Sequence, residues 1–388
     1  MSVRLPETDT NLPSAKSTPK NYMLLYAGKP TYGGWVSFTA HLSHQLSHQL
    51  SHLQSHSQSS PTQNIYKIGK RSESRWRTFG YNCSYQNNTL LDIAKKLSSQ
   101  LPQLPQSHLI VTAVDHNYYS SIDGLFQLLV DRNINVTVSV VVHDPTEVAG
   151  KKAIPFLQLL QTYSTPLPSG FKIDIITIRP RVKEHLETKY NLSSECRYHP
   201  FYPFKKIAQP SPTSSISTPI AVSISRIDHD KHTNIIVEAN NVLSPERKIT
   251  IYGAMNGFYA YKKLHNYDSM KRDDPKSMYR GTYPKDWDCL ASLLQSYQYV
   301  VDLSIIKGDG GHTQYTFLES VYLSRVLILH RKWISGNDSI WVEGVNCLAI
   351  ESSDELVELL NNPLDSVSYQ KILDNSKKIL DPSFQIWK

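Results

Sequence analysis

Short apolar runs alternate with amphipathic stretches along most of the chain. Runs rich in β-branched residues, such as HLIVTAVD at 108–115 and NVTVSVVVHD at 135–144, predict buried strands. Apolar residues that recur every three or four positions, as in LLDIAKKLSSQL at 90–101, predict helices between them. Such alternation is typical of α/β folds in which helices cover both faces of a parallel sheet. The expected strands are 22–28, 65–70, 108–115, 135–144, 172–178, 220–227, 248–254, 278–281, 299–305, 326–330 and 347–351.

Two changes in composition divide this pattern. Residues 1–20 are polar and rich in Pro, Thr and Ser, so we expect a disordered tail. A second segment without period, rich in Pro and Ser, predicts a linker at 201–219. We therefore expect an N-terminal domain at 21–200, a C-terminal domain at 220–375 and a final segment, 376–388, that packs back on the first domain. The predicted architecture is two Rossmann-like, doubly wound domains that face an interdomain cleft.

A four-residue repeat interrupts the first domain at 43–63. It places His44, His48, His52 and His56 on one face of any helix, beside a stripe of leucines. Histidines one turn apart could bind a metal ion, but catalytic metal sites usually add a carboxylate or a cysteine. We favour a low-complexity insertion that lengthens the first helix, and we predict no metal site.

Composition narrows the class of partner. The 388 residues carry a formal charge of +7 and a pI of about 9.0, which favours an anionic ligand or a basic surface. The four cysteines are far apart in the sequence and suit free thiols. No apolar run approaches the ~20 residues of a membrane span. We expect a cytoplasmic protein without a transmembrane segment.

Four loops follow the carboxyl ends of predicted strands, where α/β sheets bind ligands. They contain Gly33–Gly34, His143–Asp144, the cations Arg226 and Lys231, and the glycine-rich run GDGGHTQYTFLE at 308–319. A glycine-rich turn before a helix leaves backbone N–H groups for a phosphate. An Arg and a Lys at a strand–helix junction can clamp a diphosphate. Together the four loops predict a site for a phosphorylated sugar nucleotide.

The densest basic cluster lies between 67 and 77. It contains Lys70, Arg71, Arg75 and Trp76, which could bind an acceptor or stack on a nucleic acid. A solvated loop explains these residues equally well.

The order of these motifs resembles that of the retaining glycosyltransferases of family 4, which have the GT-B fold. The segments that carry the resemblance are GGWVSFTAHL, VVVHDP, SRIDHDK, GGHTQYTFLESVYLSR and EGVNCLAIE. In SRIDHDK the Arg and Lys keep the family spacing, and Ser225 replaces the family glycine. The run YTFLE is also similar to one in phage α-glucosyltransferases that modify DNA bases.

The resemblance implies a role for each loop. Arg226 and Lys231 would bind the donor diphosphate, Glu319 the ribose and His143 the transferred sugar. The donor would also contact Gly33, Gly34, Gly311, His312, Thr313 and Gln314. The first glutamate of the family pair is absent, because Gly311 stands at its position; the nearest acid, Asp309, is the expected catalytic replacement beside His143 and Glu319.

The predicted activity is transfer of a sugar from a nucleotide-sugar to a glycan or another hydroxyl with retention of configuration. We expect a UDP-sugar as the donor in preference to a GDP- or ADP-sugar. No cofactor and no metal ion are expected. Two alternatives remain open: a glucosyltransferase that acts on hydroxylated DNA bases, and a non-catalytic protein that binds nucleotide-sugars.

Overall fold

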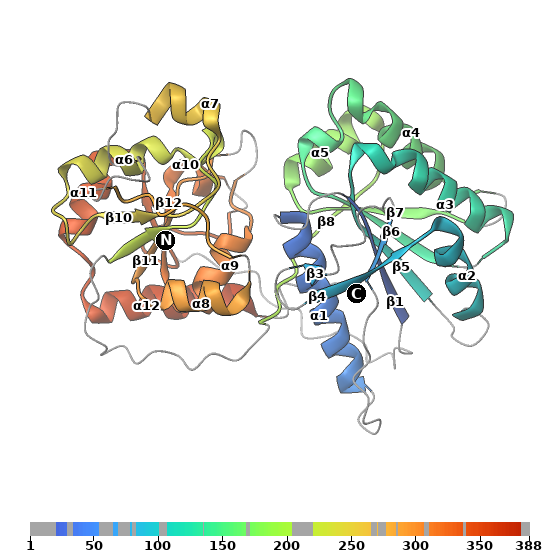
Figure 1. The fold of residues 1–388 in the computed structure, drawn as a ribbon, viewed down its shortest axis with the longest axis horizontal. Coiled ribbons are helices and arrows are strands. Elements are labelled where there is room, and N and C mark those ends of the chain that lie inside the picture. The colour runs from blue at the N-terminus through green and yellow to red at the C-terminus, as the bar shows by residue number, and fades with distance from the viewer. Residues whose placement is uncertain are drawn as a thin grey trace.

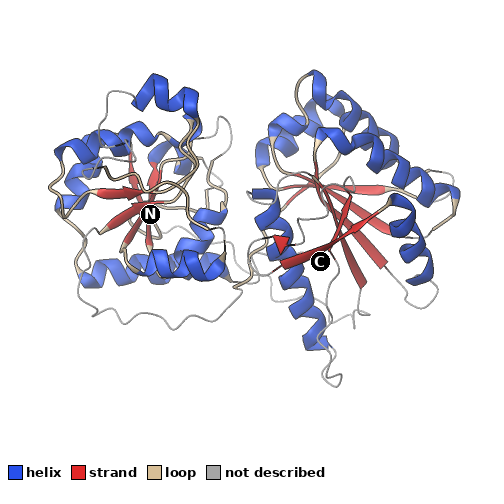
Figure 2. Ribbon diagram, viewed as in Figure 1, coloured by secondary structure: helices blue, strands red, loops and turns tan. Residues whose placement is uncertain are grey.

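The computed structural model describes residues 21–28, 34–53, 65–68, 78–79, 83–100, 107–134, 136–167, 171–203, 220–264, 270, 277–284, 286–305, 310–336 and 339–381. These residues form two sheets that lie side by side, each flanked by helices (Figure 1). In Figure 2 the strands of each sheet lie between layers of helices.

The first sheet has eight strands in its described part, in the order β3-β4-β2-β1-β5-β6-β7-β8. All pairs are parallel except β3 with β4. The strands are β1 Asn21–Ala27, β2 Ile65–Ile68, β3 Thr78–Phe79, β4 Cys83–Asn88, β5 Ser107–Val114, β6 Thr137–Val142, β7 Ile173–Thr177 and β8 Glu195–Cys196. The helices are α1 Gly34–Leu53, α2 Leu90–Gln100, α3 Tyr119–Asp131, α4 Ile154–Ser164 and α5 Pro180–Tyr190.

The second sheet is parallel throughout, in the order β10-β9-β11-β12-β13. Its strands are β9 Ala221–Ser223, β10 Ile249–Ile251, β11 Tyr299–Asp302, β12 Val326–His330 and β13 Leu348–Ile350. Its helices are α6 Thr233–Val242, α7 Gly257–Tyr259, α8 Trp287–Gln295, α9 Tyr315–Tyr322, α10 Arg331–Ile334, α11 Ser353–Asn361 and α12 Ser366–Lys377. Side chains cap several N-termini: Asp286 accepts from the Cys289 N–H, and Ser352 from the Glu355 N–H.

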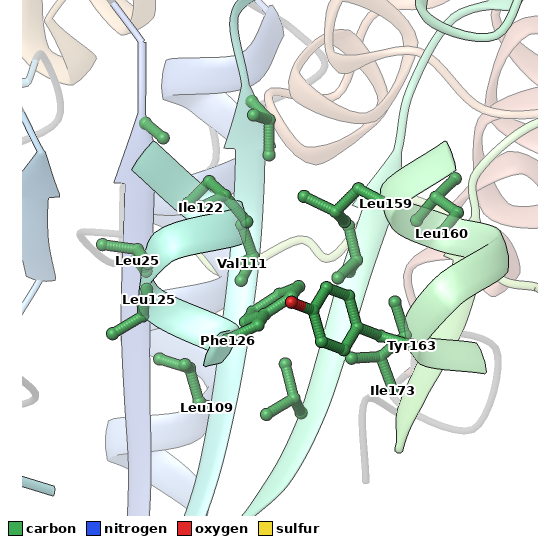
Figure 3. Packing of buried hydrophobic residues seen from close by; sticks show 14 of the residues in the cluster. Leu25, Leu109, Val111, Ile122, Leu125, Phe126, Leu159, Leu160, Tyr163 and Ile173 are labelled. Atoms are coloured by element: carbon green, nitrogen blue, oxygen red, sulfur yellow. The ribbon is translucent and has the colours of Figure 1, made fainter. Parts of the chain in front are cut away.

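Each face of the first sheet is covered, as the continuous apolar strands predict. Leu24 and Tyr26 of β1 lie in one core with α1, whereas Leu25 lies in the other with α3 and α4. Figure 3 shows the second core, where the ring of Tyr163 meets Phe126 edge to face at 5.2 Å. The prediction of an α/β fold with two parallel sheets is confirmed.

The core under α1 continues into the second domain. Phe201, the first residue of the predicted linker, packs on Trp287 of α8 and Tyr322 of α9. His41 of α1 stacks on Tyr315 at the start of α9, with ring centroids 4.8 Å apart and planes inclined by 7°. The two domains therefore share one apolar cluster.

Several local predictions need correction. The expected strand at 278–281 is only a single bridge between Tyr279 and Ile251, because its backbone turns at Gly281, which has φ 78°. The short strands β3, β4 and β8 carry no apolar run and were not predicted.

The repeat helix extends to Leu53, with Leu42 and Leu46 buried and the His44 ring stacked on Tyr202.

Three further observations concern the cysteines, the length of the helices and the final segment. Cys196, Cys289 and Cys347, whose side chains the structure describes, form no disulfide bond. No helix in the described ranges is both long and apolar enough to cross a bilayer. In the final segment, residues 378–380 lie against α9, and residues 382–388 lie outside the described residues.

Candidate functional site

The order of strands reverses at one place in each sheet. In the first sheet β1 and β5 lie side by side although they are distant in sequence, and in the second β9 and β11 do so. Helices leave on opposite sides of such a pair, so a crevice opens at the carboxyl ends of its strands. Lys231 follows β9, and Ser304 follows β11, so both belong to this edge of the second sheet.

Lys231 is the more buried of the two cations at this edge of the sheet. Its ammonium donates to Ser304 Oγ at 2.5 Å and to Gln314 Oε1 at 3.0 Å. Only 10% of its side chain is exposed, and Asp302 Oδ1 lies 3.8 Å away. An ammonium has three N–H donors, and two of them bond to described side chains here. The third has no hydrogen-bond acceptor among the described residues, so it could bind a ligand oxygen.

Asp302 is the buried centre of this network. Its carboxylate accepts from Ser225 Oγ at 2.5 Å and from the Ser304 N–H at 3.1 Å, and the Ser304 hydroxyl also donates to it. Its side chain is fully buried, so these donors replace water. Ser225, which stands where the resembled family has glycine, thus contributes to the position of Lys231. Sequence reasoning missed Asp302, because one acid at the end of an apolar strand gives no distinct signal.

Arg226, the second cation, has an exposed side chain, in contrast to Lys231. Its guanidinium lies 3.4 Å from Asp228 and 3.5 Å from Asp230, and 64% of its side chain is exposed. Exposed ion pairs of this kind contribute little, typically ~0–1 kcal/mol. Arg226 can therefore leave these carboxylates for a stronger anion at small cost.

The glycine-rich loop has a fixed shape where the structure describes it. Gly311 has φ 75°, and a Cβ there would lie 2.6 Å from Ser339 Cα. Its N–H donates to the Trp333 carbonyl at 2.5 Å. The indole N–H groups of Trp333 and Trp341 donate to the His312 carbonyl. A glutamate at position 311 is incompatible with this backbone, so the missing family acid has a structural reason.

Helix α9 begins directly after this loop. Its first residue, Tyr315, follows Gln314, whose side chain accepts from Lys231 and does not cap the helix. The first-turn N–H groups of a helix lack partners within the helix and carry partial positive charge. The lysine and the helix N-terminus therefore present donors at the same place, suited to an anion.

The segment that leaves the first domain runs beside this loop. The Tyr198 ring lies 4.7 Å from that of His312, and Thr313 Oγ1 lies 3.0 Å from His199 Nδ1. One step further, the Tyr315 hydroxyl donates to the Pro200 carbonyl at 3.2 Å. We call residues 198–200 the crossing segment. It fixes the loop by contacts from outside the second domain.

His143 directly follows β6 in the first domain. Its Nε2 lies 2.6 Å from the Thr112 carbonyl, which can only accept, so Nε2 carries the proton. Burial lowers the pKa of His143 to about 4. The ring is therefore neutral near pH 7, with Nδ1 as an acceptor, and it packs edge-on against Phe38 at 4.6 Å.

Two further side chains hold the His143 loop. The Glu147 carboxyl accepts the His143 N–H, and burial raises its pKa well above the usual value. Arg179 Nε donates to the His143 carbonyl at 3.0 Å. Neither was predicted, although Glu147 follows four residues after the His in HDPTE.

The remaining described candidates lie on helices. Gly34 is the first residue of α1, and a Cβ there would meet none of the described residues within 4 Å. Glu319 is buried on α9, and its charge adds to burial in raising the pKa of Tyr283 and Tyr315. Glu319 therefore lies near both phenols, below the start of α9.

The structure does not describe every residue that the sequence predicts for the site or for the histidine repeat. Outside the described residues lie Gly33, Asp309, Lys70, Arg71, Arg75, Trp76 and His56, together with the side chains of His48 and His52. Among the residues that the structure describes, no cluster of three or more His, Cys, Asp or Glu could hold a metal ion.

No protein-family model and no curated protein matches the sequence. Solved structures do match. HepE (Alr3699) of Anabaena in complex with UDP and glucose aligns with TM-score 0.61 and 12% identity, over 94% of this chain and 95% of that one. An α-glucosyltransferase in complex with UDP-glucose and DNA containing an abasic site aligns with TM-score 0.65 and 11% identity, over 93% and 95%. A glycosyltransferase from Rickettsia africae ESF-5 aligns with TM-score 0.52 and 13% identity, over 94% of each chain. The chain has the GT-B fold and resembles UDP-sugar-using glycosyltransferases in structure.

Proposed function

We propose that this protein is a glycosyltransferase that moves a hexosyl group from a UDP-sugar to a hydroxyl of a glycan, with retention at the anomeric carbon. The observation that carries the proposal is the junction of Lys231, Gln314 and the N-terminus of α9 at the carboxyl edge of the second sheet. The structural neighbours whose complexes contain UDP or UDP-glucose support the choice of donor.

The donor diphosphate would lie on this junction. Lys231 supplies its third N–H, the first turn of α9 supplies backbone donors, and Arg226 turns from its exposed carboxylates to a phosphate oxygen. Together they would stabilise the charge that develops on the departing diphosphate. Because these groups belong to the chain, we propose that the reaction needs no metal ion. Glu319 would accept from the ribose hydroxyls.

The transfer would occur between the two domains. The acceptor hydroxyl attacks C1 of the sugar on the face from which the diphosphate leaves. The C1–O bond to the β-phosphate breaks, and the hydroxyl proton passes to the departing phosphate oxygen. His143 would accept a hydrogen bond from a sugar hydroxyl through Nδ1. Gly34 would leave room for the donor above α1.

A thermal-shift screen with UDP-, GDP- and ADP-glucose tests the donor site. We expect UDP-glucose to raise the melting temperature of the wild type, because a ligand that binds only the folded state stabilises it. The shift should disappear in Lys231→Ala and persist in Lys371→Ala, an unrelated lysine on α12. If none of the three nucleotides stabilises the wild type, the donor assignment is wrong.

An acceptor on DNA is the second candidate. It is favoured by the likeness to the α-glucosyltransferase whose complexes contain DNA. UDP release in the presence of oligosaccharides or of DNA with hydroxymethylated bases separates the two acceptors. UDP-sugar binding with neither hydrolysis nor transfer would leave a non-catalytic binding protein.

A further inference from the structure

A pocket of about 390 Å³ lies between α5 of the first domain and His312 of the glycine-rich loop. Its size falls within the range of small-molecule sites. Pro180, Lys183, Glu184, Glu187 and Thr188 of α5 form one wall. Cys196 of β8, Tyr198 of the crossing segment and His312 complete the lining. Both domains therefore contribute to this pocket.

The lining groups suit a polyhydroxylated ligand. The Glu184 carboxylate has no hydrogen-bond or ion-pair partner among the described residues, so it can accept from ligand hydroxyls. Lys183 lies 3.8 Å from Glu187 on the same face of α5, and about 40% of each side chain is exposed. Such an exposed pair can share donors and acceptors with a ligand at little cost. Tyr198 adds an aromatic ring with a polar tip.

The pocket adjoins the proposed donor site through the backbone of the loop. His312 lines the pocket, and Gln314, two residues later, contacts Lys231. On the opposite wall, Pro180 begins α5 directly after Arg179, which donates to the His143 carbonyl. The pocket thus borders both halves of the proposed reaction centre.

We propose that this pocket is the acceptor subsite and that it takes an uncharged oligosaccharide. The acceptor role rests on the proposed transferase function; the binding of a neutral sugar does not. The lining holds two carboxylates, Glu184 and Glu187, and one ammonium, Lys183, so its formal net charge is −1. Such a lining disfavours the phosphates of a nucleic acid, which are bound through Lys and Arg.

A second, larger pocket of about 910 Å³ near β6–β8 does not support a comparable site. Four of its five charged groups pair with one another: Lys172 with Asp174 at 3.3 Å and Arg197 with Glu195 at 2.6 Å; the fifth, Lys183, pairs with Glu187 and is shared with the smaller pocket.

The test combines a pocket-filling variant with a matched control. Thr188→Trp places a large ring in the pocket, whereas Lys189→Trp adds the same ring to the next position of α5, which does not line it. Maltose and lactose serve as uncharged probes in saturation-transfer difference NMR. UDP-induced thermal shifts of the same three proteins report the donor site independently.

We expect the disaccharides to give signals with the wild type and with Lys189→Trp. Thr188→Trp should weaken binding roughly tenfold, which corresponds to about 1.4 kcal/mol. The UDP-induced shift should be equal in all three proteins. Absence of disaccharide signals with the wild type, or equal signals with Thr188→Trp, overturns the proposal. Binding of hydroxymethylated DNA that Thr188→Trp abolishes also overturns it. A missing UDP shift in the wild type refutes the donor assignment and leaves the disaccharide result to decide on the pocket.

Discussion

Acidification should weaken the contact between the two domains through His41. This ring is fully buried between Tyr315 and Phe201, and its Nδ1 lies 3.0 Å from the Tyr202 carbonyl oxygen and 3.1 Å from the Tyr202 backbone nitrogen. Burial lowers the pKa of His41 to about 3, although the backbone hydrogen bond with Tyr202 acts in the opposite direction. The folded protein therefore keeps His41 neutral at a pH where the unfolded chain, with a pKa near 6.5, is protonated.

The sign of the effect follows from proton binding. Below about pH 6.5 the unfolded state binds a proton that the folded state excludes, so stability falls as the pH falls toward 3. Each unit below 6.5 costs about 1.4 kcal/mol. Between about pH 7 and pH 5, His41 alone should therefore remove about 2 kcal/mol from the free energy of unfolding. Burial of His143 adds a similar term, which is common to the wild type and to variants of His41.

His41→Phe isolates this contribution, because phenylalanine keeps an aromatic ring against Tyr315 and has no proton to bind. Urea unfolding followed by circular dichroism gives the free energy of unfolding at each pH. The difference between variant and wild type should shift by about 2 kcal/mol in favour of the variant between pH 7 and pH 5. His116→Phe, at a site where 53% of the side chain is exposed, is the control. An equal difference at both pH values would refute the assignment of His41 as a neutral buried base.

Three further results are expected. Lys231→Ala should weaken UDP-glucose binding by about 1–3 kcal/mol, the range for charge-assisted hydrogen bonds, in isothermal titration; unchanged affinity would exclude Lys231 from the site. Ser225→Ala should lower the free energy of unfolding by about 1.5–3 kcal/mol, because it leaves the buried Asp302 without one donor, and an unchanged urea midpoint would contradict this. Gly311→Ala should cost at least about 2 kcal/mol through its left-handed backbone and the clash with Ser339, whereas Gly336→Ala, in open space, should cost less.

The alternation of apolar strands and helices was sufficient to predict both sheets, because buried parallel strands must be apolar on both faces. This alternation did not predict β3, β4 and β8, because these strands are short and polar. Spacing also placed Lys231 and Gln314 in one site, since loops at the carboxyl edge of a sheet converge whatever their distance in sequence. It could not find Asp302, Glu147 or Arg179. These residues act through contacts between distant segments, and isolated acids or arginines in a sequence usually lie on the surface.

The contacts of the crossing segment limit where this chain could be joined to a domain from a protein of related fold. Its contacts with His312, Thr313 and Tyr315 come from residues that precede the predicted linker. A chimera cut at that linker would join a foreign first domain to a loop shaped by Tyr198, His199 and Pro200. The smallest unit that could be transferred to another protein is therefore the second domain together with the crossing segment. Recombination at the linker alone would separate the glycine-rich loop from the residues that contact it.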